Sequence, residues 1–236
     1  MIASLILLGT ILVLGAPAAI VFIPWTVIAG DAGALYKVSL LILRAGCRLA
    51  GIRVEAAGRD RLPQNTACIF MANHISNLDP VVLFPHIPGR TSALIKSSLL
   101  RIPVLGYGLR LAKFVPVERD GRVESAQANV AAARRVLESG IHITTFVEGT
   151  RSLDGRLLPF KKGPFYLAMD AGVPCIPVSI WGTQAMMAKG SLRIRPGTAK
   201  VVFHAPIYPR DHATREDLLE AVRAAIASGL PESMRG

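Results

Sequence analysis

Residues 67–80 read ACIFMANHISNLDP and join an apolar run to a polar turn and a helix start. Residues 67–71 are apolar and rich in strand formers, which is typical of a strand buried on both faces. The Ser-Asn pair at 76–77 can turn the chain, and Asp79-Pro80 suits the first turn of a helix because proline has no N–H to lose there. The segment therefore predicts a strand, a turn and a helix, the unit from which α/β folds are built.

Strands and helices alternate along the whole body of the chain. The expected strands are 67–71, 113–117, 141–147 and 175–181. A helix is expected at 124–139, where it ends before a glycine, and Thr214 caps a last helix at 215–228. Segments 192–195 and 200–204 suggest a hairpin around a Pro-Gly pair. Alternation of this kind predicts an α/β fold in which a β-sheet lies between helices.

Residues 1–30 contain no charged side chain. The apolar run 2–28 would make a helix of about 40 Å at about 1.5 Å per residue, longer than a hydrocarbon core of about 30 Å. Pro17 and Pro24 interrupt helical hydrogen bonding, so the run predicts a kinked span or a re-entrant pair of short helices rather than one straight span. A cleaved signal peptide is disfavoured because no positive charge precedes the run. We therefore expect a retained membrane anchor.

Residues 34–50 form a second expected helix. Lys37, Arg44 and Arg48 are spaced so that they share one face of it, within about 40° of each other. A narrow basic stripe suits a helix that lies along an anionic lipid surface; an ordinary amphipathic helix docked on the body is the alternative. Basic residues after the apolar segment place the body on the cytoplasmic face of the cell (inner) membrane.

The composition indicates a folded protein with an anionic partner. Hydrophobic residues make up 51% and charged residues 18%, which excludes intrinsic disorder. The formal net charge of +11 points to a membrane surface, a nucleic acid or a phosphorylated substrate. No nucleic acid is expected as a partner, since no recognition motif is present and only 6% of residues are aromatic. Three scattered cysteines give no zinc or disulfide pattern and suit a reducing compartment.

His74 and Asp79 follow the first expected strand and are the strongest candidates for chemistry. A carboxylate beside a histidine fixes the tautomer and stabilises the imidazolium, which makes the pair a general base. Their spacing alone is a weak signal, because His212 and Asp217 repeat it. Asp217, however, lies in the first turn of the last helix, where an acid complements the helix dipole. His74 and Asp79, at the carboxyl end of a strand, are therefore preferred as the site.

A second polar segment, FVEGTRS at 146–152, also follows an expected strand. Gly149 permits close approach of the backbone, and the hydroxyl of Thr150 and the guanidinium of Arg151 suit a phosphate. A basic surface turn is the alternative interpretation when this segment is considered alone.

Two single cations and one further strand complete the candidates. Lys96 and Arg119 are possible anion ligands, although a lone cation more often lies on the surface. VPCIPV at 173–178 has two prolines around a strand, which indicates an edge or a fixed bend beside a pocket, with a core strand as the plainer interpretation. The chain has no GxSxG elbow and no cysteine beside a histidine, so nothing favours a covalent intermediate, and no cluster of ligands calls for a metal.

These segments, in this order and spacing, resemble the glycerolipid acyltransferases of the lysophosphatidate acyltransferase family. Residues 73–79 resemble the family's NHxxxxD block, 114–119 its second block, 146–152 its FPEGTRS block and 173–180 its VPxxPV block. The resemblance covers residues 66–181 firmly and the rest of the chain more loosely. Val147 stands where the family usually has proline, and we expect the backbone of this segment to keep its shape.

The resemblance implies a mixed β-sheet sandwiched by helices over residues 52–236, preceded by a membrane-embedded helical segment over residues 1–51. It also implies acyl transfer from an acyl thioester, either acyl-CoA or acyl carrier protein, to the sn-2 hydroxyl of lysophosphatidate, giving phosphatidate. His74 would be the general base and Asp79 would orient it. No cofactor is expected besides this co-substrate.

The resemblance further implies a substrate-binding set. By position this set is Lys96, Arg119, Glu148, Gly149, Thr150 and Arg151. Lys96 and Arg151 would hold the substrate phosphate, and the others would shape its pocket. The alternatives are a sister acyltransferase acting on glycerol 3-phosphate, a lysophospholipid or a lyso-ornithine lipid, and, more remotely, an inactive lipid-binding protein of the membrane. The oligomeric state is left open.

Overall fold

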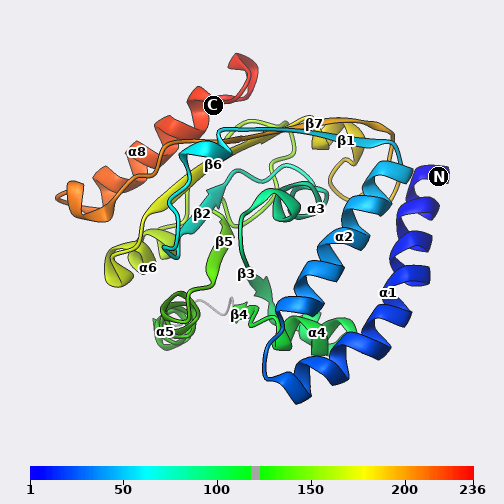
Figure 1. Cartoon of the computed structure of the whole chain (residues 1–236). Coiled ribbons are helices and arrows are strands. Elements are labelled where there is room, and N and C mark those ends of the chain that lie inside the picture. The colour runs from blue at the N-terminus through cyan, green and yellow to red at the C-terminus, as the bar shows by residue number, and fades with distance from the viewer. Residues whose placement is uncertain (118–122) are drawn as a thin grey trace.

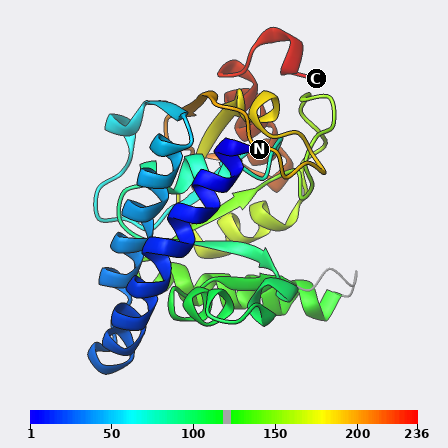
Figure 2. The same cartoon turned by 90° about the vertical axis from the view of Figure 1, so that its right-hand side faces the viewer.

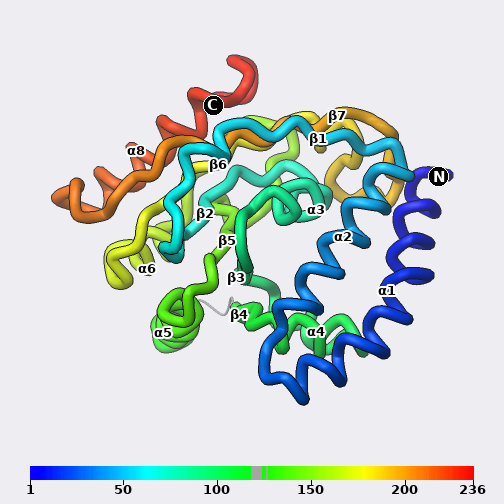
Figure 3. Tube along the Cα trace, viewed as in Figure 1, coloured from blue at the N-terminus to red at the C-terminus, as the bar shows by residue number. Residues whose placement is uncertain are grey.

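A single seven-stranded sheet forms the centre of the computed structural model, which describes residues 1–117 and 123–236 (Figures 1 and 3). Its strands are β1 (Ile52–Ala57), β2 (Ile69–Ala72), β3 (Thr91–Lys96), β4 (Val115–Val117), β5 (His142–Phe146), β6 (Cys175–Trp181) and β7 (Gly197–Phe203). The helices are α1 (Ile2–Ala29), α2 (Gly33–Leu49), α3 (Asp79–Leu83), α4 (Leu105–Leu111), α5 (Val123–Glu138), α6 (Gly163–Ala171), α7 (Thr183–Met186) and α8 (Arg215–Ser228). Helices cover both faces of the sheet, so the expected α/β fold is confirmed.

The strand directions define one edge of the sheet. The order across it is β1-β7-β6-β2-β5-β3-β4. The five strands from β6 to β4 are parallel to their neighbours, whereas β7 is antiparallel to β6 and pairs in parallel with β1. The sheet is therefore mixed, as expected. The carboxyl ends of β3, β5, β2 and β6 lie along one edge, which is where open α/β sheets place their sites.

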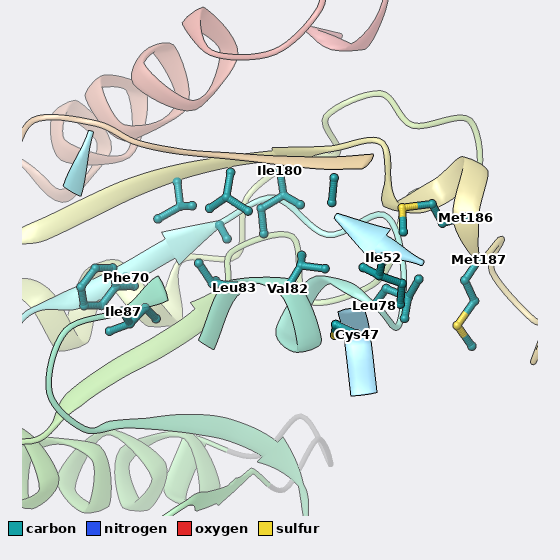
Figure 4. Close-up of a cluster of buried hydrophobic side chains, with 14 of the residues drawn as sticks. Cys47, Ile52, Phe70, Leu78, Val82, Leu83, Ile87, Ile180, Met186 and Met187 are labelled. Carbon is teal, nitrogen blue, oxygen red and sulfur yellow. The ribbon is translucent and has the colours of Figure 1, made fainter. Parts of the chain in front are cut away.

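Alternate residues of β2 enter two separate cores because side chains alternate along a strand. Phe70 and Ala72 face a core shared with α3, β6, β7 and the N-terminal helices, part of which is drawn in Figure 4. Ile69 and Met71 face the opposite core, which α5, α6 and α8 close. All four residues of β2 are buried. Packing on both faces therefore fixes the start of the polar turn that follows β2.

α1 and α2 form an antiparallel pair at one side of the sheet (Figures 1 and 2). α1 is one unbroken helix through Pro17 and Pro24, and it ends at Gly30, whose φ of 67° allows the chain to reverse. Residues 1–30 therefore do not divide into two short helices. By length and composition α1 could cross a membrane, and most of its side chains are exposed.

α2 is docked on the body, which is one of the two arrangements that its sequence suggested; the lipid-surface arrangement stays a prediction. Lys37, Arg44 and Arg48 are exposed, as expected for a basic face. The opposite side packs inward through Cys47, and the Arg44 guanidinium donates to the carbonyl of Pro85. α2 is therefore docked on the body and still presents basic groups to its surroundings.

The hairpin expected between residues 192–195 and 200–204 is wrong. Residues 200–203 belong to β7, but the segment before β7 does not pair with it. Instead, the N–H of Ile194 donates to the hydroxyl of Ser4 in α1 at 2.7 Å. β7 is paired on both sides, with β6 and with β1, so it has no free edge for the preceding segment.

Candidate active site

Polar residues that follow three neighbouring strands share the carboxyl edge of the sheet. His74 comes after β2, Glu148 after β5 and Thr183 after β6. Lys96, the last residue of β3, belongs to the same edge. Arg119, the remaining candidate, lies outside the described residues.

The Asp79 carboxylate turns back toward His74. Its Oδ2 atom lies 2.7 Å from Nδ1 of the imidazole, and the same oxygen accepts hydrogen bonds from the N–H groups of Ile75 (2.7 Å) and Ser76 (2.8 Å). Asp79 is the first residue of α3 and is fully buried, while 18% of the His74 side chain is exposed. The turn after β2 therefore brings the two expected residues into contact.

The His74 ring is fixed on two sides. A carboxylate can only accept hydrogen bonds, so the neutral imidazole carries its proton on Nδ1 and keeps the lone pair of Nε2 as its basic site. The ring also stacks on Phe146, with the ring centroids 4.1 Å apart and the planes at 20°. An imidazole held in this way is suited to remove the proton of an alcohol through Nε2.

Thr183 supports Asp79 from the opposite side, a contact that the sequence analysis did not identify. Its hydroxyl donates to Oδ1 of Asp79 at 2.6 Å, and both side chains are buried. The preceding Gly182 has a φ of 89°, and a Cβ there would lie 2.4 Å from the carbonyl oxygen of Thr198, so only glycine fits. A signal was present, because Thr183 is a polar residue just after a buried strand, the pattern that selected His74.

Glu148 lies beneath the site, with only 1% of its surface exposed. Its Oε1 accepts the N–H of His74 at 2.8 Å, and its Oε2 accepts the N–H of Leu158 at 3.0 Å. The N–H of Ser152 donates to the carbonyl of His74 at 2.8 Å. The segment after β5 therefore holds the His74 backbone at both its N–H and its carbonyl. Both Glu148 oxygens are bonded within the protein, so its expected contact with substrate stays a prediction.

Val147 makes a bond that proline could not make at this position. Its N–H donates to the carbonyl of Ala72 at 3.0 Å and extends the pairing of β5 with β2. The turn that follows is closed by a bond of 3.0 Å from the N–H of Gly149 to the carbonyl of Phe146. The segment therefore forms a closed turn with valine at this position.

The buried Glu148 carboxylate makes the stability of the fold depend on pH. Burial raises its pKa to about 7, against the opposing effect of the two N–H bonds. Between the unfolded value of about 4.5 and 7, the folded state binds more protons than the unfolded state, so stability falls as pH rises through this window. This difference in pKa corresponds to about 3 kcal/mol of folding free energy, which is lost as the pH rises through the window.

We therefore expect Glu148→Gln to flatten the loss of stability between pH 4.5 and 7, because glutamine does not titrate. Urea unfolding midpoints of the detergent-purified protein at several pH values in this window would measure the slope. Glu220→Gln, at an exposed position on α8, is the control and should keep the wild-type slope. An unchanged slope in Glu148→Gln would show that this carboxylate is not the titrating group.

Cations gather on the segments around His74. Arg151 is half-buried, and its carbonyl accepts a bond of 2.9 Å from Nζ of Lys189. Gly149 has a φ of 69°, and a Cβ there would lie 3.0 Å from Cγ of Lys161. Thr150 and Lys96 are exposed. The edge therefore offers a hydroxyl and several cations, which suits an anionic substrate.

The competing pair of His212 and Asp217 has a structural explanation. Asp217 forms a capping box with Thr214 at the start of α8: its Oδ2 accepts the N–H of Thr214 at 3.0 Å, and its own N–H donates to the Thr214 hydroxyl at 3.1 Å. The expected helix cap is confirmed.

Among the residues that the structure describes, no three His, Cys, Asp or Glu side chains gather to hold a metal ion.

Comparison with known proteins identifies the family to which the sequence is similar. The acyltransferase family model matches residues 53–181. A 1-acyl-sn-glycerol-3-phosphate acyltransferase of Chlamydomonas reinhardtii is 34% identical over 186 residues, which cover 78% of this chain and 55% of that protein. The human 1-acyl-sn-glycerol-3-phosphate acyltransferase alpha is 30% identical over 200 residues, covering 85% of this chain and 70% of that protein. The chain thus spans between about half and two thirds of the length of several curated relatives it matches.

The fold has a solved counterpart over nearly its whole length. The crystal structure of the 1-acyl-sn-glycerophosphate (LPA) acyltransferase PlsC from Thermotoga maritima superposes with a TM-score of 0.78 at 27% identity, covering 97% of this chain and 93% of that one. The four sequence segments, the mixed sheet and the relatives agree. This chain belongs to the acyltransferase family.

Proposed function

We propose that the protein transfers a fatty acyl group from an acyl thioester to the sn-2 hydroxyl of lysophosphatidate and releases phosphatidate. The observation that carries this proposal is the His74 imidazole, held by Asp79 with Nε2 as its basic site at an edge rich in cations. The names of the matched relatives support the choice of acceptor.

In the proposed reaction, Nε2 of His74 takes the proton of the acceptor hydroxyl as its oxygen attacks the thioester carbonyl. The Asp79 carboxylate stabilises the imidazolium that forms. When the tetrahedral intermediate collapses, the carbon–sulfur bond breaks, and the departing thiolate takes the proton back from His74. The histidine is thereby returned to its neutral form for the next turnover.

Direct transfer, without an acyl-enzyme, agrees with the state of the cysteines. Cys47, Cys68 and Cys175 are free and buried. Burial raises the pKa of Cys68 and of Cys175 to about 12, so neither is a thiolate near neutral pH. These thiols are therefore poor nucleophiles, and the acceptor oxygen itself would attack the donor.

The proposed acceptor has a phosphate group and one acyl chain. The protein has cations that suit the phosphate and an apolar helix that suits the membrane in which the acyl chain lies. Arg151 and Lys96 are proposed to hold the phosphate, since a guanidinium and an ammonium make strong charge-assisted bonds to phosphate oxygens. The apolar α1 is proposed to keep the enzyme on the inner membrane, where such a lipid resides, with the sheet on the cytoplasmic face.

The proposal is tested by acyl transfer with detergent-purified protein. Labelled acyl-CoA and acyl carrier protein would be compared as donors. Lysophosphatidate would be run beside glycerol 3-phosphate, lysophosphatidylcholine and a lyso-ornithine lipid as acceptors. The expected result is acyl transfer to lysophosphatidate, giving phosphatidate, and no transfer to the other three acceptors. Transfer to another acceptor would assign a sister activity, and no transfer by folded protein would contradict an enzymatic function.

Arg151→Ala is expected to raise the apparent KM for lysophosphatidate by about 10- to 100-fold, since a charge-assisted hydrogen bond contributes about 1.5–3 kcal/mol. The kcat should change less, because the base is untouched. Arg156→Ala, at an exposed position shortly after this segment, is the matched control and should keep the wild-type KM. Unchanged acceptor kinetics in Arg151→Ala would remove Arg151 from the phosphate site.

A further inference from the structure

An apolar turn lies exposed on the surface shortly after Lys96 in the chain. It consists of Ile102, Pro103, Val104 and Leu105, here called the 102–105 tip, and all four residues are exposed. The exposed fractions are 45% for Ile102, 61% for Val104 and 49% for Leu105. Large aliphatic side chains exposed side by side, rather than singly, mark a surface that meets an apolar partner.

Backbone hydrogen bonds hold the shape of the 102–105 tip. The N–H of Gly106 donates to the carbonyl of Ile102 at 2.7 Å, and that of Ile102 to Leu99 at 3.3 Å. Gly106 is buried so closely that a Cβ would lie 2.2 Å from the carbonyl oxygen of Leu100. Val104 has a φ of 62°, which a β-branched residue rarely adopts. The exposure of these side chains is therefore built into the turn.

The tip leads into α4, which lies beside the C-terminal half of α1. α4 contacts α1, and the two helices lie next to each other in Figure 1. A cavity of about 390 Å³ between them is lined by Thr26 and Val27 of α1 and by Tyr107 and Leu111 of α4. The apolar tip is thus close to the exposed apolar surface of α1.

The charged residues that flank the tip in the sequence are basic, and one of them, Arg90, is paired with the Asp31 carboxylate at 2.6 Å. Residues 80–117 contain five basic residues and no acidic one. The five are Arg90, Lys96, Arg101, Arg110 and Lys113. Arg101 immediately precedes the tip, and Arg101 and Arg110 are both exposed. An apolar tip with a basic border complements the acyl chains and phosphates of an anionic bilayer.

We propose that the 102–105 tip inserts into the same leaflet of an anionic phospholipid bilayer as α1, and that this second contact brings the Lys96 end of β3 down to the lipid surface. The inference rests on the proposed function, because it takes α1 as the membrane anchor. It adds a second point of contact, and two contacts fix the orientation of the sheet on the membrane where one helix would leave it free to rotate. A lipid acceptor could then reach Lys96 and His74 without leaving the bilayer.

The insertion is tested by depth measurement with the full-length protein. Val104→Cys would be labelled with an environment-sensitive fluorophore in vesicles of phosphatidylcholine and phosphatidylglycerol, with acyl-chain-brominated lipid as quencher. The three native cysteines are buried and will not compete for the label. Val13→Cys in α1 reports the anchor, and Met169→Cys on α6 serves as the control away from the helix pair (Figure 1).

Quenching at Val104 and Val13 but not at Met169 is the expected result. Quenching at Val13 alone would overturn the inference and leave the membrane anchor of the proposed function intact. Absence of quenching at both Val13 and Val104 would contradict the anchor as well. Equal quenching at all three positions would show non-specific adsorption and would also overturn the inference.

A functional measurement separates insertion from simple contact. The double variant Val104→Asp/Leu105→Asp should lose about tenfold in kcat/KM on vesicle-borne lysophosphatidate. It should keep wild-type activity on a short-chain, monomeric lysophosphatidate in solution, since the tip has no part in the proposed chemistry. Met169→Asp is the control on both substrates. Equal losses on the two substrates would point to a damaged site and contradict a role at the membrane.

Discussion

Replacing His74 with alanine is expected to abolish acyl transfer with little loss of stability. General-base catalysis contributes about 10²- to 10⁴-fold, and His74 would serve both the proton removal and the proton return. The side chain is partly exposed and its backbone bonds to Glu148 and Ser152 remain in the variant, so the turn should keep its shape. Initial rates with lysophosphatidate, together with unfolding midpoints of both proteins, would measure the two effects separately.

The matched control is His212→Ala. His212 belongs to the second pair of the same spacing, but its partner Asp217 caps α8. This variant should keep near wild-type turnover. Equal losses in His74→Ala and His212→Ala would contradict the assignment of the site, and full activity in His74→Ala would remove the general base from the mechanism.

Asp79→Asn is expected to lower kcat by about 10²- to 10⁴-fold while the protein still folds. The asparagine oxygen can accept the bonds from His74, Ile75 and Ser76, and its amide can donate to Thr183, whose hydroxyl accepts after rotating. The hydrogen bonds can therefore be kept and only the negative charge is lost. Without that charge the imidazolium formed during the reaction is less stable, and the loss appears in kcat rather than in acceptor KM.

The split between kcat and KM distinguishes this effect from a merely structural one. Loss of the negative charge should lower kcat and leave the acceptor KM near its wild-type value. Thr183→Ser retains the hydroxyl bond to Asp79 and should leave both parameters unchanged. Wild-type kcat in a folded Asp79→Asn protein would show that His74 works without an orienting carboxylate.

Much of this architecture could be predicted because its signals are local. The apolar run before Asn73, the turn at 76–77 and the proline after Asp79 lie within fourteen residues, and together they predicted β2, the turn and α3. The same rule applied to β5 and located the segment 146–152 at the same edge. Strand ends in a parallel sheet meet wherever the strands are neighbours, so the spacing of these segments in sequence did not matter.

The rest depends on contacts that sequence patterns do not encode. β1 reads IRVEAA and β3 reads TSALIK, so neither is a continuous apolar run, and neither was predicted. Their place in the sheet depends on pairing with β7 and β5, which lie far away in the chain. The bond from Thr183 to Asp79 spans 104 residues, and the Glu148 bond to His74 spans 74. The failed hairpin has the same origin, since its first half is bonded to α1 rather than to its neighbour in sequence.

The packing of the helix pair has a consequence for how the enzyme can be divided. Ala3 and Leu7 of α1 and Cys47 of α2 belong to the same buried cluster as Phe70 and Val178 of the sheet. A boundary after residue 51 therefore passes through a shared core, although it separates the helix pair from the sheet. The two parts are not interchangeable modules, and exchanging helix pairs between relatives would require the facing core residues to be exchanged with them.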